Sequence, residues 1–233
     1  MTDLAIDTSV THPPFRAPLS PAEARRAVAA ASVGNGLEFY DFVTFAFFAI
    51  QIGHTFFPGG SAYLSLMGAL ATFGAGFITR PIGAWVLGGY ADRVGRKPAM
   101  LFSMTLMGVS IAVLALTPGY ATIGIAAPII AIGARLAQGF ALGGEVGSAT
   151  AYMMEAATED RRGFMVSWQG ATQQVALSAG ALVGLLLALF LSAEQLDSFG
   201  WRIALLIGVV IVPFGLMIRR SLPETLPEAG PVA

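Results

Sequence analysis

The sequence predicts an all-α integral membrane protein with six transmembrane helices. Of its 233 residues, 55% are hydrophobic and only 12% are charged, and the mean hydropathy is +0.71. A soluble domain carries about 25% charged residues, so this composition is typical of a chain that lies in a lipid bilayer. Six stretches are long enough, at about 20 residues each, to cross the hydrocarbon core as helices. They are residues 31–56, 62–89, 98–117, 122–152, 165–192 and 201–219.

The basic residues indicate the orientation of these stretches. The chain has 13 Lys and Arg residues. All but three lie near the starts of the first, third and fifth stretches or near the ends of the second, fourth and sixth. Because loops rich in Lys and Arg remain in the cytoplasm, we expect both termini to be cytoplasmic, in the plasma or inner membrane. We expect residues 1–30 to form a mobile N-terminal tail, residues 31–220 the helical bundle, and residues 221–233 a C-terminal tail.

Four ionisable residues form one layer inside the predicted spans. Glu38 and Asp41 are spaced i and i+3, so they share one face of the first helix. At a rise of about 1.5 Å per residue, both acids and Arg80 lie roughly 10–15 Å from the cytoplasmic ends of their helices, and Arg135 lies near the bilayer midplane. A charge in hydrocarbon costs at least ~2.5–3.5 kcal/mol, which makes this buried layer a candidate functional site.

Two interpretations of the acids remain open at this stage. Asp41 or Glu38 could take and release a coupled proton, or the pair could neutralise Arg80 and join the first helix to the second. For Glu38, which is closer to the cytoplasmic rim, we favour the structural role. Arg135 could likewise bind a carboxylate substrate bidentately, or bond only to helix carbonyls or to an acid of the first helix.

Several classes of function are disfavoured by the composition. The chain has no cysteine and only two histidines, and no spacing typical of a nucleophile with its base or of a metal site. No polybasic run suggests a nucleic-acid partner. We therefore expect neither an enzyme nor a metal site, and no cofactor beyond a coupled proton.

The loop after the second predicted span carries an ordered motif. Residues 88–97 read GGYADRVGRK, which resembles the loop signature of the major facilitator superfamily, G-x-L-A-D-R-x-G-R-R/K. The resemblance implies a gate that closes and opens with the transport cycle. Its residues would be Gly88, Asp92, Arg93, Gly95, Arg96 and Lys97. The alternative is a plain cytoplasmic loop, which explains the bases but not the ordered acid and glycine.

The fourth predicted span strengthens this resemblance. Arg135 and Gln138 lie in the sequence RLAQG, which is similar to the superfamily's fourth-helix motif R-x-x-Q-G, whose arginine is associated with substrate or proton coupling. Glu145 follows nearer the cytoplasmic end. We expect it to pair with Arg93 or Arg96 and so help to close the inner gate.

Further motifs are similar to those of one family within the superfamily, the metabolite:H⁺ symporters. They are G-N-x-x-E-x-x-D-F at residues 34–42 and R-P-x-G-A at residues 80–84. Residues 163–169, 173–176 and 219–225 look most like the citrate and tricarballylate transporters. The resemblance implies proton-coupled symport of a small organic anion, such as a di- or tricarboxylate. Asn35, Gln138 and Gln169 could then hydrogen-bond the substrate, or equally bridge helices.

The resemblance also implies a partner. A family member should have twelve helices in two halves, with the substrate between them, so this chain would supply the amino-terminal half and one wall of the cavity. We expect a separately encoded second half or a homodimer to complete it. The competing hypothesis is a truncated, non-transporting membrane protein or assembly partner whose charges only hold helices together.

Overall fold

The computed structural model describes residues 21–221, and every regular element in that part of the chain is helical. Six helices have 20 or more residues within this range, and short helices connect them. In chain order the elements are α1 (Pro21–Phe47), α2 (Ala49–Phe56), α3 (Ala62–Val94), α4 (Arg96–Leu116), α5 (Tyr120–Ile123), α6 (Ala126–Ala156), η1 (Glu159–Arg161), α7 (Arg162–Phe190), α8 (Ala193–Gln195), η2 (Leu196–Gly200) and α9 (Trp201–Arg220).

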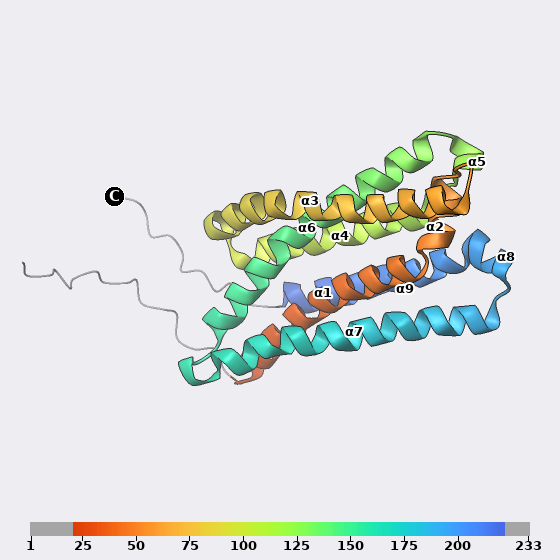
Figure 1. The fold of residues 1–233 in the computed structure, drawn as a ribbon. Coiled ribbons are helices and arrows are strands. Elements are labelled where there is room, and N and C mark those ends of the chain that lie inside the picture. The colour runs from red at the N-terminus through yellow and green to blue at the C-terminus, as the bar shows by residue number, and fades with distance from the viewer. Residues whose placement is uncertain (1–20, 222–233) are drawn as a thin grey trace, which may run out of the picture.

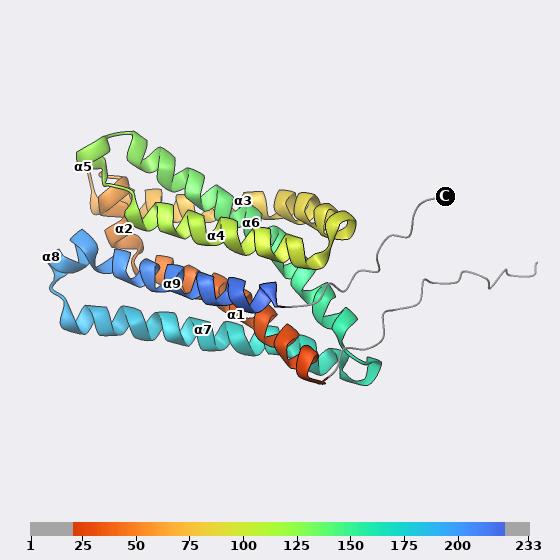
Figure 2. The ribbon, with the colours of Figure 1, turned by 180° about the vertical axis from the view of Figure 1, so that it is seen from behind.

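The long helices form a bundle of two groups (Figure 1). Helices α3, α4 and α6 lie together, and α1, α7 and α9 lie together, as the view from behind also shows (Figure 2). Helix α6 packs against α3 and α4, while α1 packs against α7 and α9 and also reaches α6. The core between the groups is apolar and includes Phe45, Met107, Ile111 and Trp201.

Five of these helical segments are long and apolar enough to cross a membrane: Ala62–Val94, Arg96–Leu116, Ala126–Glu155, Glu159–Phe190 and Ala193–Arg220. They correspond to the second to sixth predicted spans. The first predicted span, residues 31–56, folds as α1 and α2 with a break at Phe48, and it is not among the five. Helix α1 is less apolar because it carries Asn35, Glu38 and Asp41 in the half that would lie in the membrane.

Some predicted boundaries are wrong. The expected loop between the second and third spans is almost entirely helical, because α3 continues to Val94 and α4 begins at Arg96. The single residue between them, Gly95, has a φ of 131°, a backbone conformation that a residue with a side chain rarely adopts. Residues 21–30, expected in the N-terminal tail, belong to α1. The rest of that tail, and the C-terminal tail beyond residue 221, lie outside the described residues.

Close backbone contact joins α3 to α6. A Cβ atom at Gly139 would collide with the Gly76 carbonyl oxygen, and one at Gly143 would collide with the Arg80 carbonyl oxygen. In the opposite direction, a Cβ at Gly76 would lie 3.1 Å from the Arg135 carbonyl oxygen. Small residues permit this approach in membrane bundles. The α3–α6 contact therefore fixes the main chains that carry Arg80 and Arg135.

We predict that Gly139→Leu destabilises the bundle because the added side chain cannot fit between α3 and α6. Overpacking costs typically 1–3 kcal/mol, so the midpoint of thermal unfolding in detergent should fall by roughly 5 °C. Gly133→Leu is the matched control, since Gly133 lies on the same helix and faces open space. Equal losses in the two variants would contradict the packing interpretation.

Candidate functional site

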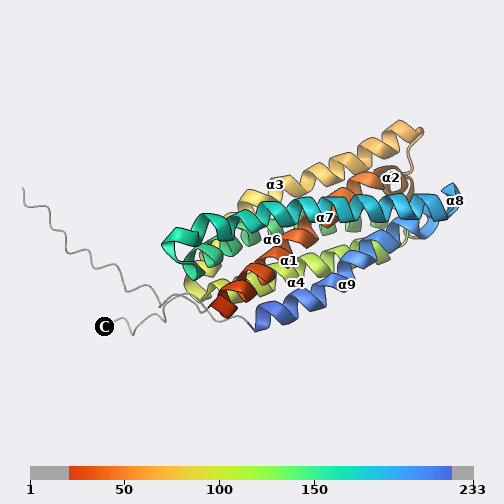
Figure 3. The same ribbon diagram turned by 90° about the horizontal axis from the view of Figure 1, so that it is seen from below.

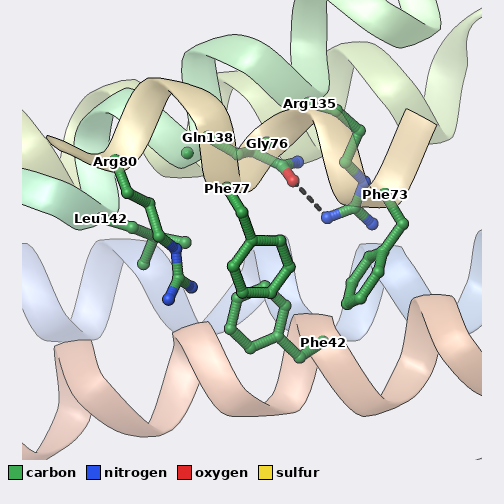
Figure 4. Close-up of a pocket in the computed structure, with 9 residues that line it drawn as sticks. Phe42, Phe73, Gly76, Phe77, Arg80, Arg135, Gln138 and Leu142 are labelled. Carbon is green, nitrogen blue, oxygen red and sulfur yellow. Dashed lines mark hydrogen bonds between the residues drawn. The ribbon is translucent and has the colours of Figure 1, made fainter. Parts of the chain in front are cut away.

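A buried ion pair between α6 and α1 forms the centre of the site. Arg135 Nη1 lies 2.6 Å from Asp41 Oδ2, and the two residues are only 2% and 5% exposed. The same nitrogen also donates to Gln138 Oε1, one turn further along α6 (Figure 4). Because Gln138 is i+3 from Arg135, the helix itself brings the amide to the guanidinium.

The guanidinium of Arg135 is only partly satisfied. Its Nε and Nη2 atoms are buried and have no hydrogen-bond partner, and the same holds for Asp41 Oδ1 and Gln138 Nε2. The ring centroid of Phe45 lies 3.8 Å from the Arg135 Cζ atom and that of Phe73 lies 5.7 Å away. A cation over an aromatic face is stabilised by the ring quadrupole, which offsets part of the cost of removing Arg135 from water.

A second ion pair lies one turn toward the basic end of the bundle. Arg80 Nη2 of α3 donates to Glu38 Oε1 of α1 at 2.9 Å. The Arg80 guanidinium lies over the rings of Phe42 and Phe77, at 4.7 and 4.5 Å from their centroids, and those two rings stack on each other. Glu38 is buried, whereas 28% of the Arg80 side chain is exposed. The Arg80 side chain is therefore partly accessible to a ligand.

Both arginines line one pocket between α1, α3 and α6 (Figure 4). The phenyl rings of Phe42 and Phe77 lie between the two guanidinium groups in that view. The full set of lining residues is Phe42, Phe73, Gly76, Phe77, Arg80, Arg135, Gln138, Gly139 and Leu142. Two cations, one amide and an apolar aromatic wall are the chemistry that an organic anion requires.

The predicted layer of four charges is present, with a different pairing from one of our interpretations. We considered that Glu38 and Asp41 together neutralise Arg80. In the structure only Glu38 pairs with Arg80, and Asp41 pairs with Arg135. The reason is the i, i+3 spacing of the acids, which sets them about one turn apart along α1, so each meets the arginine at its own depth.

Asn35 and Gln169, which we expected near the substrate, lie outside this pocket. Asn35 Nδ2 donates to the Gln169 backbone carbonyl at 2.8 Å, and Gln173 Nε2 donates to Asn35 Oδ1 at 3.2 Å. The Gln169 side chain accepts a hydrogen bond from Thr150. These contacts join α1 to α7 and α6 to α7, so the bridging alternative describes the observed geometry.

The predicted gating loop lies at the junction of α3 and α4. Arg96 Nη1 is 2.6 Å from Asp92 Oδ1, and its Nη2 is 3.4 Å from Glu155 Oε1 of α6. Gly95 provides the one-residue turn, and Arg93 is exposed beside it. At Gly88 an added Cβ would meet no atom within 4 Å. Arg96 thus joins the end of α3 to the end of α6 through two charged side chains, of which Asp92 is exposed and Glu155 largely buried.

The expected pairing of Glu145 with Arg93 or Arg96 is wrong. Glu145 Oε1 instead accepts from Arg219 Nη2 of α9 at 2.6 Å, and Arg219 Nη1 donates to the Met100 carbonyl of α4 at 2.8 Å. Arg219 is 0% exposed and Glu145 2%. A Cβ atom on Gly34 would overlap this pair, so the glycine lets α1 pass beside it. Glu145 is therefore part of the protein core, away from the surface loop.

Comparison with known proteins identifies the family. The sequence model described as sugar (and other) transporter matches residues 27–227. The chain belongs to this transporter family. The citrate-proton symporters of Salmonella typhi and Klebsiella pneumoniae are each 46% identical to it over 192 residues, which is 82% of this chain and 44% or 43% of theirs. The alpha-ketoglutarate permease of Escherichia coli is 40% identical over 88% of this chain and 49% of its own.

The solved structures of transporters agree with this assignment at the level of fold. The xylose symporter XylE, a major facilitator superfamily protein, superimposes with a TM-score of 0.80 at 18% identity, over 89% of this chain and 46% of XylE. This chain spans about half the length of the relatives it matches. Those relatives are transporters rather than enzymes. In residues 21–221 no group of three or more His, Cys, Asp or Glu could hold a metal ion.

Sequence reasoning missed the aromatic residues that lie against the two arginines. Phe45 is i+4 from Asp41 on α1, and Phe77 is i−3 from Arg80 on α3, so each ring shares a helix face with a charge. That spacing is visible in the sequence and could have found them. The burial of Arg219 could not be predicted in this way. Arg219 is followed by Arg220, and two adjacent arginines at the end of the last span are typical of an exposed basic flank.

We predict that removing one charge of the Glu145–Arg219 pair destabilises the protein more than removing both. Glu145→Met or Arg219→Met alone should each cost about 3–5 kcal/mol, because an uncompensated charge remains buried. The double variant with both changes should cost less than either single one. The measurement is thermal unfolding in detergent, with Arg161→Met, a change in an exposed pair, as the control that alters little. Additive losses in the double variant would refute the pairing.

Proposed function

We propose that this chain forms the six-helix amino-terminal half of a major facilitator transporter that carries a small organic anion, such as citrate or another di- or tricarboxylate, together with protons. The observation that carries the proposal is the pocket with Arg135 and Arg80 in a chain 46% identical to two citrate-proton symporters. In this proposal α1 and α2 together cross the membrane as the remaining span.

The Asp41–Arg135 pair supplies the coupling chemistry. While Asp41 is ionised, it holds the guanidinium of Arg135 at 2.6 Å and competes with any other carboxylate for the cation. A proton on Asp41 removes its charge and weakens this pair, so an anionic substrate binds Arg135 more tightly. By linkage, a bound anion favours the protonated form of Asp41 equally. Glu38 and Arg80 repeat the arrangement one turn away, in a position better suited to joining α1 to α3.

The loop at Gly95 would gate the cavity from the cytoplasmic side. The basic ends of α3, α7 and α9 and the start of α1 gather at one end of the bundle, which is the arrangement that the positive-inside rule requires (Figures 1 and 3). At that end Arg96 lies between the exposed Asp92 and the largely buried Glu155, so a movement of α3 against α6 would have to break or exchange these two contacts. The gate could then open without unfolding either helix.

The pocket needs a second wall, since the residues that line it come only from α1, α3 and α6. A second six-helix unit would supply it, either from the same polypeptide, from a separately encoded chain or from a second copy of this one. The competing hypothesis, a membrane component that does not transport, requires that the buried charges contribute to stability alone.

The deciding experiment is uptake of radiolabelled citrate into proteoliposomes driven by an inward proton gradient. The chain is reconstituted alone and together with the carboxy-terminal half of the Salmonella typhi relative. We predict uptake that collapses when the gradient is removed. Arg135→Gln should lower it by about tenfold or more at unchanged protein content, since each bond to a charged group is worth about 1.5–3 kcal/mol.

Arg220→Gln is the control, because Arg220 is exposed and distant in sequence from the pocket. Loss of uptake that merely follows loss of folded protein in Arg135→Gln would favour the non-transporting alternative. Absence of gradient-driven uptake in both preparations of the unmodified chain would refute the proposed function.

A further inference from the structure

We propose that Glu145 carries the coupled proton between Asp41 and the cytoplasmic end of the bundle, with Glu38 as the intermediate group. This inference rests on the proposed function and deepens it, because it names the route by which Asp41 exchanges its proton. It comes from the contact between α1 and α6, where three buried carboxyl groups follow one another. We call Asp41, Glu38 and Glu145 the acid row.

The contacts between α1 and α6 fix the order of the acid row. Asp41 of α1 meets Arg135 of α6. Gly34 of α1 lies against Glu145 of α6, since a Cβ atom on Gly34 would overlap Glu145 Oε1. A lower number on α1 thus corresponds to a higher number on α6. Positions 34, 38 and 41 are spaced i, i+4 and i+7 and share one face of α1, so Glu38 lies between these two contacts.

Glu38 is within electrostatic reach of both other acids. The negative charges of Asp41 and Glu145 each act on Glu38. At a rise of ~1.5 Å per residue, Gly34 and Asp41 are about 10 Å apart along α1, and Glu38 divides that length into two steps of about 5 Å. A proton crosses a step of this size through one water molecule between two carboxyl groups.

Each member of the acid row has one oxygen beside an arginine and one oxygen that is unbonded. The bonded oxygens meet the guanidinium groups of Arg135, Arg80 and Arg219. The other oxygens are buried and have no hydrogen-bond partner; they are Asp41 Oδ1, Glu38 Oε2 and Glu145 Oε2. A carboxyl group can therefore hold a proton on its second oxygen while its first stays beside the arginine. Glu38 can pass a proton in this way and still join α1 to α3.

The transfer returns every acid to its starting form. Asp41 gives its proton to Glu38 Oε2 and becomes a carboxylate again, which restores its pair with Arg135 and releases the anion. Glu38 gives a proton to Glu145 Oε2, and Glu145 gives one to water. The charged groups that face Glu145 are Arg219 of α9 and Glu38 of α1. Arg219 favours the ionised form of Glu145 and so the loss of the proton.

Glu145 lies toward the basic end of the bundle. Its partner Arg219 is the penultimate residue of α9, and Arg219 also bonds the Met100 carbonyl in the second turn of α4. The next residue, Arg220, is exposed. The acid row therefore leads from the pocket to the depth at which α9 ends and α4 begins. In the alternative, the Glu145–Arg219 pair contributes to stability alone.

Exchange and net uptake separate these two roles of Glu145. Exchange of labelled for unlabelled citrate at equal pH on both sides needs no release of the proton, whereas gradient-driven uptake needs it in every cycle. We predict that Glu145→Gln lowers the ratio of gradient-driven uptake to exchange by at least about tenfold, since acid–base groups contribute that much or more to proton transfer. The measurement uses the proteoliposomes of the uptake experiment. Both rates scale with the amount of folded protein, so their ratio is independent of it.

Three further variants complete the test. Glu145→Asp, which keeps a carboxyl group, should retain the ratio within about threefold. Glu159→Gln is the matched control and should leave the ratio unchanged, because Glu159 is an exposed acid just beyond α6. If Glu145→Gln does not fold, the double variant Glu145→Gln with Arg219→Gln replaces it, since no buried charge is then left uncompensated, and the same loss is expected. An unchanged ratio in the variant that folds would overturn the inference.

The outcome is distinguishable from failure of the proposed function. Exchange and uptake by the unmodified chain, with an unchanged ratio in Glu145→Gln, would refute the proton route and leave the proposed symport standing. Exchange without gradient-driven uptake by the unmodified chain would refute the symport itself, and the route with it.

Discussion

The guanidinium of Arg135 imposes the constraint on which the site depends. A permanent cation in a nearly dry interior is tolerable only if other groups replace the water it has lost. Asp41 supplies the opposite charge, Gln138 an oxygen, and Phe45 an aromatic face. These partners come from α1 and α6, so satisfying one side chain also determines how the two halves of the bundle meet.

The same requirement explains why α1 is the least apolar of the long helices. Its acids are placed where α3 and α6 present arginines, and its glycine at position 34 lies where α9 and α6 form a third buried pair. Each of these features lowers the hydropathy of α1 while raising its affinity for its neighbours. A segment can thus belong in a membrane bundle because of its partners, although its own composition is marginal for the bilayer.

Most of the architecture could be predicted from the sequence because its signals are local. Apolar stretches of about twenty residues, separated by glycine, proline and basic residues, predicted six spans, and five of them are helices long and apolar enough to cross a membrane. The helical rise per residue placed Glu38, Asp41, Arg80 and Arg135 in one layer. Pairing could not be predicted in the same way. Whether Glu145 meets Arg96 or Arg219 depends on which helices are neighbours at that depth, and this is a property of the packed bundle. The same limit applies to Asn35, whose polar side chain could equally have faced a cavity or α7.

The reciprocal glycines of α3 and α6 have a consequence for movement. The main chain of Arg80 packs against Gly143 and the main chain of Arg135 packs against Gly76, so the two cations are carried by two helices in close backbone contact. Their counter-ions are mounted on α1, which touches α6 far less extensively than α3 does. A tilt of α1 relative to α3 and α6 would lengthen both ion pairs in a single motion. Arg80 and Arg135 would then lose their carboxylate partners at the same time.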